Sequence, residues 1–183
     1  LDEMRLRKDD HELELLRRAG RVTAESFREA AASVRPGAGE WEVEAALEFA
    51  FRRRGAEFTA FPSIIGSGPN ATVLHYIENR RRMREGELLL IDAGASVAGY
   101  AGDISRTFPV SGRFSPAQRA LYEVVVAAHG QAIAAVRPGA TIVEVHLTAV
   151  GVLVEGLREL GLLTGSFEEI IEEGAHRVFY PHQ

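Results

Sequence analysis

The chain alternates between segments with helical hydrophobic spacing and shorter apolar segments. Apolar residues recur every three to four positions over residues 9–33, 40–54, 115–137 and 141–161. Three of these segments begin at Asp, Ser or Thr, which are the residue types that cap helix N-termini. The pattern predicts four helices, followed by a short fifth one over residues 166–173.

The segments between the helices predict β-strands. FTAFPSII (58–65) and TVLHY (72–76) are rich in aromatic and β-branched residues, and RVFY (177–180) has the same character. GELLLIDAG (86–94) contains a continuous apolar run, and YAGDISRTFPV (100–110) is its expected hairpin partner. Strands between helices, with a hairpin rather than a repeated strand–helix unit at the centre, predict an α+β fold.

A short repeat occurs at an offset of 102 residues. VRPGAGEWEV (34–43) and VRPGATIVEV (136–145) match at seven of ten positions, and each ends one predicted helix and starts the next. Two junctions with the same turn chemistry would explain the match, and so would a duplication of two similar halves. Under the duplication, the first half runs over 9–110, and the strands of the second half would follow Gln183.

Composition narrows the class of protein. Hydrophobic residues make up 46% and charged residues 26%, which fits a globular protein, and the net charge of −5 disfavours nucleic acid and anionic membranes as partners. The absence of cysteine excludes disulfides, cysteine-ligated zinc and thiol catalysis. No apolar stretch approaches 18 residues and no targeting signal opens the chain, so a cytoplasmic location is expected.

Two aspartates occur in the predicted hairpin. If its turn is centred between Val97 and Ala98, Asp92 and Asp103 face each other across the strands and point to one face. Facing carboxylates repel unless a proton or cation lies between them, and oxygen ligands suit a divalent ion. A slip of one residue would send one carboxylate to the other face. Turn, cap or ion-pair roles, with Arg106 as the partner, remain the alternative.

Two histidines are candidates for chemistry. His75 follows the loop GSGPN, and His182 is the penultimate residue. A lone histidine beside a tyrosine is more often structural than catalytic, so the residues alone leave both roles open. The chain shows no Ser-His-Asp arrangement, and GSGPN lacks the Gly-Lys-Ser/Thr ending of a phosphate-binding loop.

Longer strings are more specific. SIIGSGPNATVLHY, and GYAGDISRTFPV followed by GRFSPAQRALY, resemble the catalytic domain of Xaa-Pro aminopeptidases (aminopeptidase P). These are pita-bread metallopeptidases, a group that includes prolidase and methionine aminopeptidase. The resemblance implies one catalytic domain over 1–183, with two similar halves on a curved antiparallel sheet and an incomplete second half. The family's N-terminal domain would precede Leu1 and is absent from this sequence.

The resemblance also implies roles for individual residues. Asp92 and Asp103 match the first two ligands of a site for two divalent metal ions, usually Mn²⁺. His75 and His182 match substrate-contacting catalytic histidines. The remaining ligands, one histidine and two glutamates, would follow Gln183, so the 183 residues alone are expected to be inactive and poorly soluble.

The implied activity is hydrolysis of the bond before proline in Xaa-Pro-Yaa peptides by a metal-activated water, releasing the N-terminal residue. The expected partner is therefore a peptide with proline at its second position, and a homodimer or higher oligomer is expected. Prolidase, which cleaves Xaa-Pro dipeptides, is one alternative. A non-catalytic module that binds peptides or proteins is the other, although retention of Asp92, Asp103 and His75 argues against it.

Overall fold

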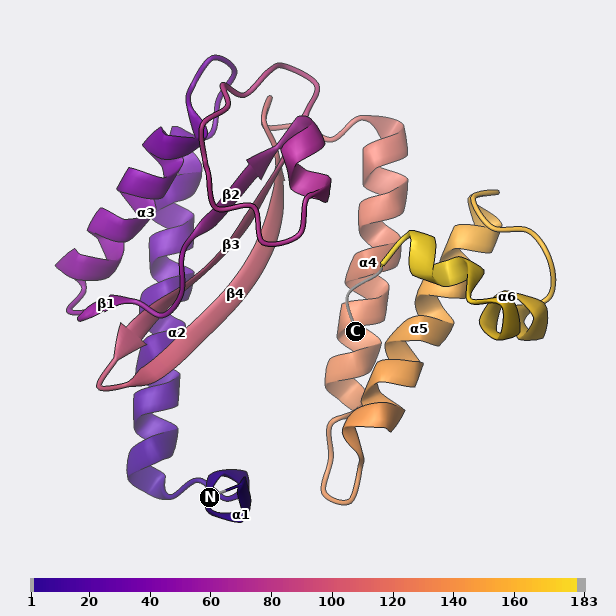
Figure 1. Ribbon diagram of the computed structural model, residues 1–183, viewed down its shortest axis with the longest axis horizontal. Helices are drawn as coiled ribbons and strands as arrows, with labels where there is room; N and C mark the ends of the chain where they lie inside the picture. The colour runs from indigo at the N-terminus through magenta and orange to yellow at the C-terminus, as the bar shows by residue number, and fades with distance from the viewer. Residues whose placement is uncertain (1, 181–183) are drawn as a thin grey trace. The chain divides into compact units, whose positions relative to one another are not determined.

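The computed structural model describes residues 2–180 and has an α+β fold, as the sequence predicts. The chain divides into two compact units, residues 1–113 and residues 114–183 (Figure 1). Within the described residues, all four strands belong to unit 1, and unit 2 is helical. None of the helices among residues 2–180 combines the length and apolar character needed to cross a membrane.

The helices of unit 1 start where cap residues predict. Asp9 accepts a hydrogen bond from the N–H of Glu12, and the Glu12 carboxylate accepts one from the N–H of Asp9, each at 2.8 Å. This reciprocal pair begins α2, whereas the short α1 was not predicted. The helical elements are α1 (Asp2–Leu6), α2 (Asp10–Ala30), the 3₁₀ helix η1 (Ala31–Ser33) and α3 (Glu40–Arg53).

The four strands of unit 1 form an antiparallel sheet around β3. β4 pairs with β3 along its whole length on one edge, and β1 and β2 pair with the other edge. The strands are β1 (Phe58–Thr59), β2 (Ile64–Ser67), β3 (Leu88–Val97) and β4 (Tyr100–Pro109). The strand predicted over 58–65 is therefore two short strands, and Pro62, which cannot donate to a ladder, lies in the break.

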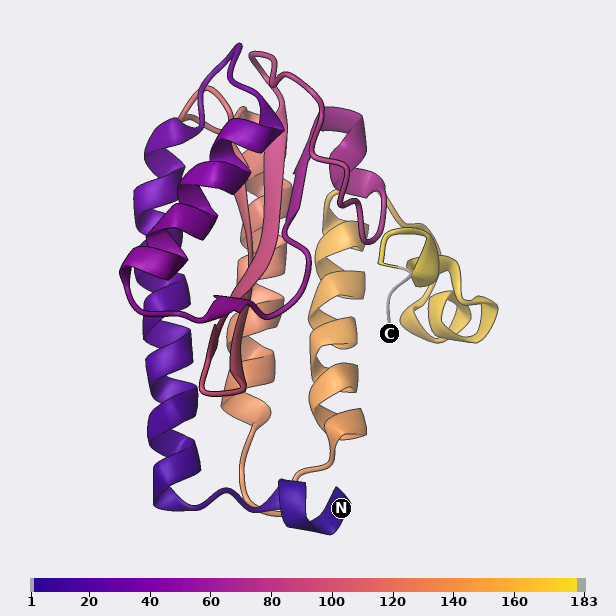
Figure 2. The ribbon, with the colours of Figure 1, turned by 60° about the vertical axis from the view of Figure 1, so that its left-hand side comes forward.

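One face of the sheet packs on α2 and α3, which lie on the same side of it (Figure 2). Every second residue of β3 belongs to the core cluster that also contains Phe27 and Phe51. At α2, the Thr23 hydroxyl accepts a hydrogen bond from the N–H of Ala95 at 3.0 Å, so helix and sheet are joined by more than apolar contact. The core-facing residues of β3 are Leu89, Ile91, Ala93, Ala95 and Val97.

The β3–β4 hairpin turns one residue later than expected. Ala98 and Gly99 both have positive φ, at 50° and 81°, which is the backbone of a two-residue type I′ turn. Val97 therefore pairs with Tyr100, and Asp92 pairs with Ser105. The predicted direct pairing of the two aspartates is wrong, because their register differs by two residues from the expected one.

Two other predicted strands are wrong. Residues 68–72 form the 3₁₀ helix η2 (Gly68–Thr72), and a turn around His75 follows it instead of a strand. Residues 175–178 form the 3₁₀ helix η3 (Ala175–Val178). In both segments the amides donate to carbonyls three residues back, as in Val73 to Asn70 and Phe179 to His176, each at 3.1 Å. The β-branched and aromatic composition that favours strands did not prevent these local turns.

Unit 2 consists of helices with the predicted N-caps. Reciprocal hydrogen bonds at Ser115, Thr141 and Ser166 start its three α-helices. The second and third pack around a small apolar cluster that includes Val154 and Ile170. The helices are α4 (Pro116–Ala135), α5 (Ile142–Glu159) and α6 (Phe167–Glu173), followed by η3.

The repeated sequence corresponds to two junctions with the same backbone. Val34 and Val136 end their helical segments with φ, ψ of −78°, 107° and −73°, 106°. Gly37 and Gly139 follow with φ of 85° and 88°. The repeated sequence therefore forms two helix–turn–helix junctions of the same geometry, one between α2 and α3 and the other between α4 and α5. Shared turn chemistry and duplication both account for this geometry.

Candidate active site

The two aspartates lie on the face of the sheet opposite α2 and α3. Side chains alternate along a strand, and the odd-numbered residues of β3 face the helices. Asp92 is even-numbered and therefore lies on the other face. Asp103 follows Gly102, whose Cα faces α2, so the Asp103 side chain also points away from the helices. The prediction of a shared face is confirmed, because the register error was two residues and the side-chain period is also two.

Asp92 and Asp103 are diagonal neighbours on that face. Asp92 lies opposite Ser105, and Asp103 lies opposite Gly94, which places the two aspartate Cα atoms roughly 7–8 Å apart. Gly94, opposite Asp103, has no side chain of its own, and the Phe61 ring lies against it, with Cε1 3.0 Å from where a Cβ would be.

The electrostatics of the pair show that the carboxylates interact. Partial loss of water around the carboxyl raises the pKa of Asp103, and the charge of Asp92 and a hydrogen bond with Asp92 raise it further. The Oδ1 atom of Asp92 is buried and has no hydrogen-bond partner within the described residues. Buried carboxylate oxygens normally have partners, so this one requires a cation or a proton donor that the described residues do not supply.

These features fit a divalent cation. A cation between the two carboxylates would give the Asp92 oxygen a partner and would reverse the repulsion that raises the pKa of Asp103. The site is incomplete within residues 2–180, where no group of three or more His, Asp or Glu side chains is arranged to hold a metal ion. Two carboxylates alone make a weak site, because tight binding needs more ligands.

The segment that carries His75 follows β2, whose first residue pairs with Asp92. Ile64 lies opposite Asp92, whereas β2 ends at Ser67, opposite Leu89, and η2 begins directly after it. His75 is exposed and has a positive φ of 53°, which is uncommon for a residue other than glycine. His182, the other predicted catalytic residue, lies outside the described residues.

The sequence did not reveal the side chains that fix this segment. Glu40, the first residue of α3, is fully buried and accepts hydrogen bonds from residues on both sides of His75. Asn79 is also buried. Its side-chain amide accepts a hydrogen bond from the N–H of Ile65 and donates to the carbonyl of Ser63 and the carboxylate of Glu44. A glutamate at a helix start normally indicates a favourable charge at the helix N-terminus, so its sequence context gave no signal of a buried role.

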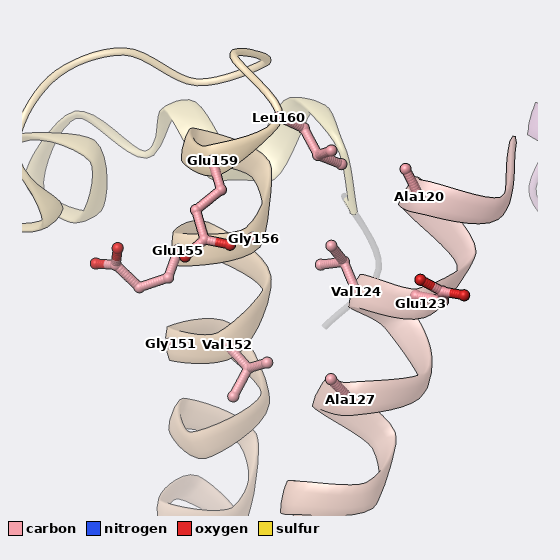
Figure 3. A pocket seen from close by; sticks show the side chains of 10 residues that line it. All are labelled: Ala120, Glu123, Val124, Ala127, Gly151, Val152, Glu155, Gly156, Glu159 and Leu160. Atoms are coloured by element: carbon pink, nitrogen blue, oxygen red, sulfur yellow. The ribbon is translucent and has the colours of Figure 1, made fainter. Parts of the chain in front are cut away.

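Unit 2 contains a groove between α4 and α5 (Figure 3). Small and apolar residues form much of it, and three glutamates also line it. One of these, Glu155, is paired with Arg158 at 2.9 Å. The lining contains no histidine and no aspartate, so the groove offers none of the predicted site residues. The lining residues are Ala120, Glu123, Val124, Ala127, Gly151, Val152, Glu155, Gly156, Glu159 and Leu160.

Comparison with known proteins gives a consistent result. The model of metallopeptidase family M24 matches residues 14–183. Xaa-Pro aminopeptidase from Escherichia coli (strain K12) is 45% identical over 180 residues, and the one from Haemophilus influenzae is 43% identical over 182. These alignments cover 98% and 100% of this chain but 41% and 42% of the relatives. The chain therefore spans about two fifths of their length.

Solved structures show the same relationship. Pseudomonas aeruginosa aminopeptidase PepP matches with a TM-score of 0.95 and 44% identity, over 98% of this chain and 40% of its own. A zinc-substituted Escherichia coli aminopeptidase P in complex with product matches with a TM-score of 0.95 and 45% identity, over 98% and 41%. The backbone described above is thus closely similar to part of these enzymes.

Proposed function

Because the chain belongs to metallopeptidase family M24, we propose that it supplies the first part of a metal-dependent aminopeptidase site that cleaves before proline. One observation carries the proposal: a buried oxygen of Asp92, which has no hydrogen-bond partner among residues 2–180, lies beside Asp103 on the face of the sheet opposite α2 and α3. The similarity to Xaa-Pro aminopeptidases supports the substrate class. Two similar halves on one curved sheet, as in pita-bread enzymes, are the proposed complete fold.

The residues have distinct proposed roles. Asp92 and Asp103 would hold the metal ions, Mn²⁺ being the proposed species, on a rigid pair of strands. Bound divalent ions would supply a nucleophilic water at neutral pH and polarise the scissile carbonyl. His75 and His182 would donate hydrogen bonds to the peptide next to the scissile bond, as in an oxyanion site.

The test uses the protein expressed from its complete gene, with Mn²⁺ added. We expect cleavage of Xaa-Pro-Yaa tripeptides and loss of at least about 10³-fold in kcat/KM for Asp103→Ala, because the metal site loses a ligand. Asp10→Asn, a change of an exposed helix residue, is the control and should retain activity. Wild-type turnover by Asp103→Ala would refute the assignment. Faster cleavage of Xaa-Pro dipeptides than of tripeptides would favour a prolidase.

A further inference from the structure

The N-terminal end of α3 contains a buried carboxylate that the proposed chemistry does not use. Glu40 is fully buried, although charged side chains are rarely buried without compensation. No Lys or Arg side chain forms an ion pair with it among the described residues. Its compensation comes from hydrogen-bond donors instead, and all of them belong to one segment of the chain.

Glu40 accepts hydrogen bonds at both of its oxygens. Oε1 accepts from the N–H and the hydroxyl of Ser67, each at 2.7 Å, and from Asn70 Nδ2 at 3.2 Å. Oε2 accepts from the Tyr76 hydroxyl at 2.9 Å and from the N–H of Arg81 at 2.9 Å. One side chain therefore joins four residues spread over residues 67–81, which we call the histidine loop.

A carboxylate is the group that this arrangement requires. Each oxygen accepts from a backbone N–H, and a backbone N–H cannot turn its hydrogen away as a hydroxyl can. Glutamine would place its NH₂ group against one of these amides in either orientation. The isosteric amide would therefore leave a buried donor opposed to a donor, which costs more than the loss of one hydrogen bond.

The bonds made by Glu40 surround His75. Asn70 precedes this histidine, Tyr76 follows it directly, and the loop is exposed at its tip but anchored at both ends. Resting on the role of His75 in the proposed function, we propose that Glu40 is a positioning residue that sets where this imidazole is presented to the peptide substrate. Glu40 acts through the backbone of the histidine loop and has no contact with substrate or metal in this role.

Other bonds define which part of the loop depends on Glu40. Asn79 ties the loop to β2 independently, through its bond from the Ile65 N–H at 2.9 Å. Arg81 donates to the Ser67 hydroxyl at 2.9 Å and pairs with Glu87. Residues 79–81 therefore retain anchors without Glu40. The stretch from Ser67 to Tyr76 loses its buried acceptor, and this stretch contains His75.

The first test measures amide hydrogen exchange in the protein expressed from its complete gene, with Glu40→Gln. We expect exchange at Ser67 and Arg81 to accelerate by at least about tenfold, since these amides lose their acceptor. Glu48→Gln is the matched control, because Glu48 lies on the same helix and its partner among residues 2–180 is the Ser63 hydroxyl, which can rotate. Unchanged protection at Ser67 and Arg81 in Glu40→Gln would overturn the proposal.

The second test is a double-mutant cycle in the protein expressed from its complete gene. Glu40→Gln should lower kcat by about tenfold with little change in bound metal, since displaced catalytic groups reduce turnover more than binding. In a His75→Ala background Glu40→Gln should have almost no further effect on kcat, because Glu40 acts on the reaction through the position of His75. Fully additive effects would show a merely structural role and would overturn the proposal.

Tyr76→Phe keeps the proposal testable if Glu40→Gln does not fold. It removes one hydroxyl donor to Glu40 and should lower kcat in the same direction by a smaller factor, again only when His75 is present. Wild-type kcat in Tyr76→Phe would then overturn the positioning role. Full activity of His75→Ala itself would instead refute the proposed function of the histidine, so the two failures are distinguishable.

Discussion

Gly102 lies where the strand that carries Asp103 touches α2. A Cβ atom added at this residue would lie 2.3 Å from the carbonyl oxygen of Ala19 and 2.7 Å from Oγ1 of Thr23. Cβ atoms in proteins rarely come closer than 3.0 Å to another heavy atom, and the nearest obstacle is helix backbone. Gly102→Ala therefore forces α2 and β4 apart by about 1 Å.

The expected cost follows from the contacts that this movement breaks. Overpacking of a core costs about 1–3 kcal/mol. The movement also strains the bond from the Ala95 N–H to Thr23 Oγ1, and a buried N–H left without a partner costs a further 1–3 kcal/mol or so. We predict a loss of about 4 kcal/mol in the free energy of unfolding of unit 1.

Amide hydrogen exchange of β3 and β4 across a urea series, in the protein expressed from its complete gene, measures this loss in unit 1 itself. With a slope of about 2 kcal/mol per M, the midpoint should fall by about 2 M. Gly20→Ala is the control: it lies in α2 with no atom within 4 Å of its added Cβ, and should stabilise the chain by about 0.5–1 kcal/mol. A midpoint within 0.3 M or so of wild type for Gly102→Ala would refute the packing argument.

Further predictions concern charge and capping. The pKa of Asp103 is raised by loss of water and by Asp92, so its contribution to stability is present at low pH and is lost as the pH rises through this pKa. Urea midpoints from pH 4 to 7 in chelator should show this loss in wild type and not in Asp103→Asn. The pKa of Glu87 is lowered by its hydrogen bonds from Arg81, at 2.6 and 2.5 Å, so this contribution is present at neutral pH and is lost on acidification. Glu87→Gln should cost about 2 kcal/mol at pH 7 and progressively less below pH 4 or so; an equal cost at both pH values would contradict the ion pair. Ser115→Ala should cost about 1 kcal/mol and speed amide exchange over the first turn of α4, and unchanged exchange there would exclude a capping role.

The helices could be predicted because their signals are local. The caps at Asp9, Ser115, Thr141 and Ser166 bond residues three positions away, so a short window of sequence contains both partners. Each of these helices begins at the predicted position. The two repeated turns were also predictable, because each is determined by a few consecutive residues.

The strands were less predictable because their pairing depends on distant residues. TVLHY has the composition of a strand but forms a turn, in which the N–H of Val73 donates to the carbonyl of Asn70, three residues back. In the hairpin, alternation of side chains fixed the shared face of Asp92 and Asp103. The turn centre depended on whether Ala98 or Gly99 accepted a positive φ, and both do.

The buried role of Glu40 could not be predicted for the same reason. Its partners lie 27 to 41 residues further along the chain, and a glutamate at the start of a helix looks like many exposed ones. The candidate ligands were found because a carboxylate inside a long apolar run is unusual. Their diagonal arrangement required the observed register.

Binding of Mn²⁺ to the protein expressed from its complete gene tests the central claim most directly. Titration calorimetry or metal analysis would compare wild type, Asp92→Asn, Asp103→Asn and the control Asp10→Asn, which makes the same chemical change on the surface of α2. We predict that wild type and Asp10→Asn bind Mn²⁺ equally and that each site variant loses at least about tenfold in affinity. Equal Mn²⁺ binding by all four proteins would contradict the assignment of Asp92 and Asp103 as metal ligands.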